Sequence, residues 1–117
     1  MTYGTIGWVQ VGTHEPTDAK RFYGELFSWT FTDGQYAEIS APGVPAPLGG
    51  LAATDDSTKN HAIFFVIVDD VAKALEKVEK LGGKALTPAT TTPDGLTFAH
   101  VQDPAGNEFG VFTPPTA

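Results

Sequence analysis

The segment Phe98–Phe112, FAHVQDPAGNEFGVF, predicts two strands joined by a tight turn. Asp103, Pro104 and Gly106 occupy the first, second and fourth positions of that turn, which favours type I geometry. Gly110 falls in the middle of the second strand, where glycine weakens pairing and offers no side chain. The position therefore raises the question of what a larger residue would have displaced.

Working outward, the chain shows one order of elements twice: a strand, a helix and three further strands. The first copy predicts a strand near residues 5–12, a helix over 16–27 and strands near 29–33, 35–40 and 48–54. The second predicts a strand over 62–68, a helix starting at Asp69 or Asp70 and ending at Gly82 and Gly83, and extended segments near 84–88, 96–102 and 108–113. We expect one domain with modules of about residues 1–54 and 60–117.

The first helix carries an apolar stripe at helical spacing, which predicts one buried face. Its members are Ala19, Phe22, Tyr23, Leu26 and Phe27. A helix would cover one face of the sheet in each module. The two faces left bare would then enclose a cavity.

The composition fits a globular protein of 117 residues, with 41% hydrophobic residues and no cysteine. Without cysteine, disulfides, thiolate zinc sites and cysteine nucleophiles are excluded. The net charge of −7 disfavours a nucleic-acid partner. The amino terminus lacks the pattern of a signal peptide, and the longest apolar run, AIFFVIV, is too short to span a membrane. We expect a cytoplasmic protein with neither a nucleic-acid nor a membrane partner.

Three segments in this order resemble the vicinal oxygen chelate superfamily: RFYGELFSW at 21–29, VIVDDVAKALEKVEKLGG at 66–83 and DPAGNEFGVF at 103–112. That superfamily includes glyoxalase I, extradiol dioxygenases, fosfomycin-resistance transferases and bleomycin-resistance proteins. The resemblance implies an α+β fold of two βαβββ modules forming cupped mixed sheets. It also implies a homodimer.

Metal-using members of the superfamily hold one divalent ion with His or Glu side chains from four strands. Counting from the shared segments places those four positions at Trp8, at or next to Gly50, at Ile63 and at Gly110. None of these side chains can bind a metal. We therefore expect no metal and no cofactor, and a small-molecule ligand as the partner. The two glycines would leave a roomier, more apolar cavity lined by Trp8.

Three polar residues are candidate ligand contacts. Gln10 shares a face with Trp8 and would orient a ligand, unless it is an exposed strand residue. His100 is either a ligand-facing donor or general base, or a hydrogen-bonded strand histidine. His61 either reaches the cavity rim or ends the polar segment in solvent. His14, just before the first helix, is expected at the surface or as a cap.

Phe65, Phe98 and Phe112 keep the same alternation parity as Ile63, His100 and Gly110 respectively and would line the cavity, although plain core packing would also explain them. A relocated metal site built from His61, His100 and either Glu108 or Glu38 is disfavoured. The family's strand order would separate the two histidine strands by about 9–10 Å.

Three functions fit the sequence. The first is a metal-independent protein that binds a hydrophobic or aromatic compound, with sequestration of that compound as its role. The second is a glyoxalase-like lyase, isomerase or dioxygenase that uses His100 or a non-standard metal site. The third is an accessory dimerisation module without a ligand. Fold analogy alone does not choose among them.

Overall fold

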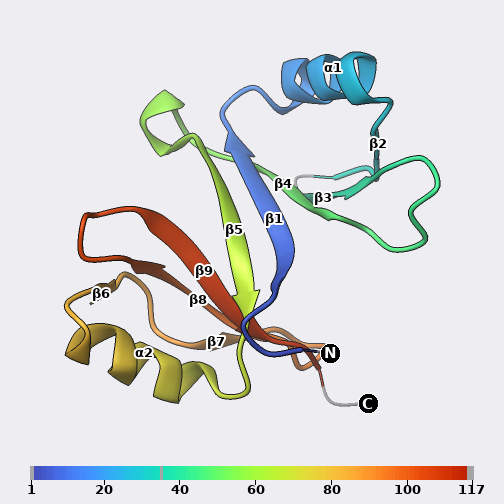
Figure 1. The fold of residues 1–117 in the computed structure, drawn as a ribbon. Helices are drawn as coiled ribbons and strands as arrows, with labels where there is room; N and C mark the ends of the chain where they lie inside the picture. Colours follow the sequence, from blue (N-terminus) through green and yellow to red (C-terminus); the bar gives the residue numbers. More distant parts are fainter. Residues whose placement is uncertain (1, 35, 116–117) are drawn as a thin grey trace. The chain divides into compact units, whose positions relative to one another are not determined.

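The computed structural model describes residues 2–34 and 36–115, and it repeats strand, helix and strands in the predicted order (Figure 1). The first set is β1 (Ile6–Thr13), α1 (Pro16–Phe27), β2 (Thr30–Phe31), β3 (Tyr36–Ser40) and β4 (Gly49–Ala53). The second set is β5 (His61–Ile67), α2 (Val71–Lys80), β6 (Lys84–Ala85), β7 (Thr90–Thr91), β8 (Thr97–Gln102) and β9 (Glu108–Thr113). A short 3-10 helix, η1 (Ser57–Lys59), lies between the two sets. The α+β class with two βαβββ modules is confirmed.

One element was not predicted, and one predicted strand includes a residue that the structure does not describe. The two-residue strand β7 was not predicted. The strand expected near 35–40 includes Gln35, which lies outside the described residues.

The chain divides into two compact units. The first unit is Trp8–Ala62, and the second contains the residues up to Gly7 and those from Ile63 onward. The expected module limits of about 1–54 and 60–117 stay a prediction.

In the first unit, the strands lie in the order β2-β3-β4-β1. β1 runs parallel to β4, whereas β3 is antiparallel to both β4 and β2. Ala37, Ile39 and Leu51 form a fully buried core on one face, packed against Val11 and Ala19 among others. Because side chains alternate along a strand, Trp8, Gln10, Tyr36, Glu38 and Gly50 share the opposite face.

Helix α1 has the predicted bounds, but the prediction that its apolar stripe is buried is wrong. None of its residues is buried, and Phe22, Leu26 and Phe27 are 55%, 58% and 50% exposed. The helix meets the core through the small Ala19, while Tyr23 stacks on Trp29 at 5.5 Å. A narrow contact at Ala19 leaves the larger side chains of the stripe in solvent.

In the second unit, the strands lie in the order β5-β9-β8-β6, and β7 pairs with β8. Helix α2 packs on β8 and β9 through a core that includes Val71, Ala99 and Val111 (Figure 1). The Asp70 carboxylate caps the helix by accepting a hydrogen bond from the Lys73 N–H at 3.0 Å. The face turned away from α2 carries the residues in register with Gly110, which are Phe65 on β5 and His100 on β8.

The predicted turn between β8 and β9 is confirmed. The Gly106 N–H donates to the Asp103 carbonyl at 3.0 Å, as a four-residue turn requires. The Asp103 carboxylate also accepts from the backbone N–H groups of Ala105 and Asn107 at 3.0 and 2.9 Å. These bonds fix the register of the two strands that carry His100 and Gly110.

The helices α1 and α2 have 12 and 10 residues, and no helix within the described ranges is long and apolar enough to cross a bilayer.

Candidate functional site

On the first unit's open face, the Tyr36 ring fills the space above Gly50. A Cβ on Gly50 would lie 2.5 Å from Tyr36 Cε1 and closer still to the phenol carbon and oxygen. The Trp8 indole holds the Tyr36 ring there by donating from Nε1 to the hydroxyl at 3.0 Å. Glycine at this position therefore accommodates an aromatic ring and does not open a space.

Burial of the hydroxyl raises the pKa of Tyr36, and the negative charge of Glu38 adds to the rise. The hydrogen bond from Trp8 acts in the opposite direction. Tyr36 as a whole is 48% exposed, so the buried part is the polar end over Gly50. The hydroxyl stays protonated at neutral pH and keeps its own proton for donation.

Gln10 and His61 form a second pair on the first unit. The His61 Nδ1 lies 2.9 Å from the Lys59 carbonyl, which only accepts, so Nδ1 carries the proton. In the neutral ring, Nε2 is then the acceptor, and the Gln10 side-chain Nε2 donates to it at 3.0 Å. Gly12 leaves room for this ring, since a Cβ there would come within 2.6 Å of both imidazole nitrogens.

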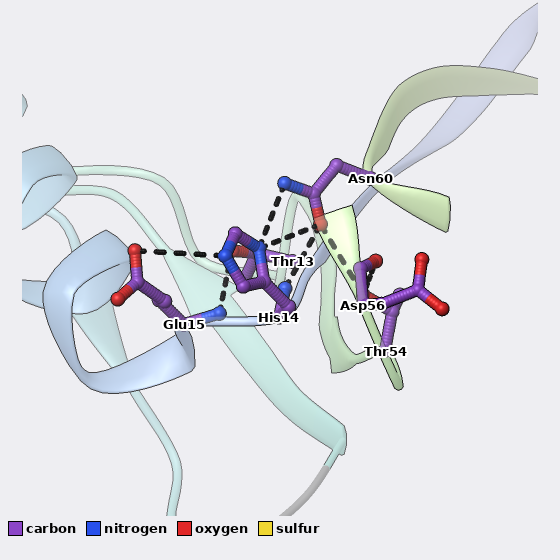
Figure 2. Close-up of polar contacts among 6 residues, drawn as sticks. All are labelled: Thr13, His14, Glu15, Thr54, Asp56 and Asn60. Atoms are coloured by element: carbon purple, nitrogen blue, oxygen red, sulfur yellow. Dashed lines mark hydrogen bonds and ion pairs between the residues drawn. The ribbon is translucent and has the colours of Figure 1, made fainter. Parts of the chain in front are cut away.

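Asn60 anchors the start of β5 just before His61 (Figure 2). Its Oδ1 accepts from the backbone N–H of His14 at 2.9 Å and from the Thr54 hydroxyl at 3.2 Å. Its Nδ2 lies 3.1 Å from His14 Nδ1. His14 is therefore a surface residue bound to Asn60. It does not cap α1, whose N-cap residue is Glu15 without a side-chain cap.

On the second unit's open face, the Phe65 ring lies over Gly110. A Cβ on Gly110 would lie 2.7 Å from Phe65 Cγ and closer to two other ring carbons. The Phe65 ring meets His100 edge-on, with centroids 5.4 Å apart, and Phe112 edge-on at 6.4 Å. Phe98 contacts His100 from its own strand at 6.2 Å. Aromatic rings therefore surround the imidazole on this face.

His100 is paired with Glu108 on the neighbouring strand. Its Nδ1 lies 3.0 Å from Glu108 Oε2, and the two side chains are 19% and 40% exposed. The backbone N–H of His100 donates to the Thr87 hydroxyl at 2.9 Å. Because a carboxylate only accepts, Glu108 fixes the proton on Nδ1 and leaves Nε2 as an acceptor in the neutral ring.

The structure distributes the predicted site residues over both units. The first unit holds Trp8, Gln10, Gly50 and His61, and the second holds Ile63, Phe65, Phe98, His100, Gly110 and Phe112. The pairing registers put Gln10 beside Gly50, Phe65 and His100 beside Gly110, and Phe98 beside Phe112, and the use of these residues as a ligand site stays a prediction. The expectation that Gly50 and Gly110 enlarge the cavity is wrong, because Tyr36 and Phe65 occupy those spaces.

Two residues at these faces were not recognised in their observed roles. Tyr36 was not singled out at all, although its alternation with Glu38 places it on the Gly50 face. Glu108 was considered only as a metal ligand, whereas it pairs with His100. The spacing of Glu108 and His100 on either side of the turn was the available signal.

The residues at the four inferred metal positions do not fit a divalent ion. Trp8, Gly50, Ile63 and Gly110 offer no imidazole or carboxylate, and two of these positions are covered by aromatic rings. Within residues 2–34 and 36–115, no three His, Cys, Asp or Glu side chains are grouped so as to hold a metal ion.

The sequence profile of the Glyoxalase/Bleomycin resistance protein/Dioxygenase superfamily matches residues 5–111. The chain belongs to this superfamily. Within it, the chain is 28% identical over 122 residues to the Mycobacterium tuberculosis protein CFP32, which carries a glyoxylase name. That match covers 93% of this chain and 45% of CFP32, so the chain spans less than half of this relative. A glyoxylase-like domain-containing protein of Didymella fabae is also 28% identical, with 98% of each chain covered.

Solved structures share the fold of this chain. A methylmalonyl-CoA epimerase from Mycobacterium tuberculosis superposes with a TM-score of 0.68 at 14% identity, covering 97% of this chain and 90% of the epimerase. An Mn(II)-bound glyoxalase from Novosphingobium aromaticivorans gives 0.67 at 22% identity, covering 95% and 39%. At these identities the likeness shows the fold, and the site has to be argued from the residues of this chain.

Proposed function

We propose that this superfamily member is a metal-independent protein that binds, and sequesters, a small hydrophobic or aromatic compound. The observation that carries the proposal is the replacement of metal-ligating side chains by glycines covered with aromatic rings. An aromatic ring stands over each of two ligand positions, the buried Phe65 over Gly110 and Tyr36 over Gly50, and the half-exposed Tyr36 ring offers aromatic surface. Such surface favours flat, apolar ligands over chelating metabolites.

The proposed contacts combine apolar walls with a few polar anchors, as ligand sites usually do. Each unit is described by its own set of contacts. In the second unit they are the apolar Ile63, Phe65, Phe98, Gly110 and Phe112, with His100 as the polar anchor. In the first unit they are Trp8 and Gly50, with Gln10 and His61 as the polar residues. His61 uses both ring nitrogens within the protein, on the Lys59 carbonyl and on Gln10, so it orients the Gln10 amide, which supplies the polar contact to a ligand.

A second function is supported by a specific observation, the His100–Glu108 pair. An imidazole oriented by a carboxylate is suited to general acid–base chemistry near neutral pH. The alternative is therefore a glyoxalase-like lyase, isomerase or dioxygenase in which His100 moves a proton. A bell-shaped pH–rate profile that is lost in His100→Ala would support this reading over simple binding.

The first experiment measures the metal content of untagged protein after equilibration with nickel, zinc, manganese or iron. Bound metal far below one ion per chain is the expected result, and one retained ion per chain would overturn the metal-independent assignment. Aromatic compounds are then screened by fluorescence in a Trp29→Phe background, which leaves Trp8 as the reporter. Responses that persist undiminished in calorimetry of Trp8→Ala would show that Trp8 is not part of the site.

Two expectations complete the proposal. We expect a homodimer, which the exposed apolar side chains Phe22, Leu26 and Phe27 on α1 support. We also expect the protein to act in the cytoplasm, in keeping with the absence of cysteine. Sedimentation of the purified chain tests the first expectation.

A further inference from the structure

The His100–Glu108 pair presents one hydrogen-bond acceptor of defined position. Glu108 Oε2 accepts the Nδ1 proton at 3.0 Å, so the neutral ring carries its lone pair on Nε2. Within the part of the chain that the structure describes, no hydrogen bond is made to Nε2. The second unit therefore holds an imidazole that is oriented on one side and available on the other.

The surroundings of this acceptor are aromatic. Phe65 and Phe98 both contact the imidazole edge-on, and Phe112 adjoins Phe65. The His100 side chain is only 19% exposed, so water has limited access to it. Phe65 and Phe112 are themselves buried, so a ligand that reaches Nε2 must bring an apolar ring to Phe98 and a proton to the nitrogen.

We infer that His100 and Glu108 select a phenolic ligand, whose ring packs on Phe98 and whose hydroxyl donates to His100 Nε2. This inference rests on the proposed binding function and narrows it to one chemical class. A phenol carries one donor next to a flat ring, which matches one acceptor beside aromatic walls.

Other classes of ligand fit less well. A carboxylate would be repelled by Glu108 and by the net charge of −7. An ammonium group would leave further N–H donors unpaired against phenylalanine rings, which costs free energy. An aromatic ether would have the ring but no proton for Nε2.

The test compares 4-cresol with 4-methylanisole, which has the same ring but no hydroxyl proton. Affinities are measured by calorimetry at neutral pH, where 4-cresol keeps its proton. We expect 4-cresol to bind at least about tenfold more tightly, which is the effect of one hydrogen bond to an acceptor with little access to water.

Two variants connect this preference to the pair. His100→Phe keeps an aromatic ring and is expected to bind both probes equally. Glu108→Gln keeps a polar partner but loses the charge that fixes the proton on Nδ1, so the preference for 4-cresol should fall about fivefold to tenfold. Glu76→Gln is the control for the loss of one negative charge, because Glu76 is exposed on α2 and away from this face.

The possible outcomes distinguish the phenol inference from the proposed binding of aromatic compounds. If both probes bind equally to the wild type, the phenol inference is overturned and aromatic binding stands. A preference that survives in His100→Phe would overturn the role of the pair. If neither probe binds, the phenol inference and the proposed aromatic binding fail together.

Discussion

The Phe65 ring on β5 lies over Gly110, its register partner on the parallel strand β9. A side chain at position 110 and the Phe65 ring cannot occupy the same place, because even a Cβ would come within 2.7 Å of Phe65 Cγ. Phe65 is 4% exposed, so its ring has little freedom to move aside. The effect of this contact and of related ones on stability can be measured with variants and over a range of pH.

Gly110→Ala is expected to lower the free energy of unfolding by about 1–3 kcal/mol, because it overpacks a buried contact. Urea denaturation of Gly110→Ala, Phe65→Leu, the double variant and the wild type measures the effect. Adding Phe65→Leu to Gly110→Ala should recover part of the loss, although Phe65→Leu alone is destabilising. If the two changes were simply additive, the ring would not be the group that excludes a side chain at 110.

Gly49→Ala and Gly12→Ala form a matched pair in the first unit. A Cβ on Gly49 would press on the backbone carbonyl of Val9, at 2.8 Å from its carbon, and this backbone belongs to the β1–β4 pairing. We expect a loss of about 2–3 kcal/mol for Gly49→Ala. The three atoms nearest to a Cβ on Gly12 all belong to the His61 ring, a side chain that can move aside.

Gly12→Ala should therefore cost only about 1 kcal/mol, from the weakened hydrogen bonds of His61. Nitrogen NMR of the His61 ring checks this, because the fixed Nδ1–H tautomer should be lost in the variant. Equal stability losses for the two alanine variants would contradict the distinction between a backbone and a side-chain neighbour.

Alkaline pH should act on Tyr36, whose pKa is raised from its ordinary value of 10.0 by burial of the hydroxyl. The folded chain then holds this proton more tightly than the unfolded chain. The stability that depends on it is complete below about pH 10 and is lost as pH rises through the higher pKa of the folded state.

Tyr36→Phe should remove this alkaline decline, while Tyr3→Phe, at an exposed tyrosine, should leave it intact. At neutral pH, Tyr36→Phe should also cost about 0.5–1.5 kcal/mol, because the Trp8 indole N–H loses its acceptor. Urea denaturation over a series of pH values gives both results. A decline that persists unchanged in Tyr36→Phe would rule out this tyrosine as its source.

Acid should act on the turn at Asp103. The side-chain amide of Asn107 is the main cause that lowers the pKa of the Asp103 carboxyl, and the backbone N–H groups of Asn107 and Ala105 add to it. The stabilisation is complete above the ordinary value of 3.8 and is lost as pH falls through the lowered pKa.

Asp103→Asn should be less stable at neutral pH and should show a shallower loss of stability in acid. Asp33→Asn, at an exposed aspartate, serves as the control. Asp56 contributes to the same acid decline, because its hydrogen bonds from Thr58 lower its pKa. Thermal unfolding at several acidic pH values would contradict the assignment if Asp103→Asn and the wild type showed the same slope.

Local patterns were sufficient to predict most of the fold. Proline at the start of α1, Asp70 before α2 and the Asp103 turn are signals carried by a few neighbouring residues. Alternation along the strands was also sufficient to place His100 and Gly110 on one face. These features depend on backbone geometry, which the sequence specifies locally.

The side chains that fill the space above a glycine were not predictable in the same way. The sequence marks Gly50 and Gly110 as positions without side chains, but Tyr36 and Phe65 reach them from other strands. The exposed stripe of α1 has a similar cause, because the helix pattern does not say how much of its apolar face the sheet can cover. Both depend on packing between elements distant in the chain.

The Phe65 ring over Gly110 also restricts the order in which this surface can change during evolution or engineering. A carboxylate side chain introduced at position 110 alone would clash with the Phe65 ring and could not bind a metal there. The ring must first be reduced, by a substitution that on its own only weakens the core. The two positions are therefore epistatic, and single-site screening at 110 would report intolerance where a paired library would find accepted sequences.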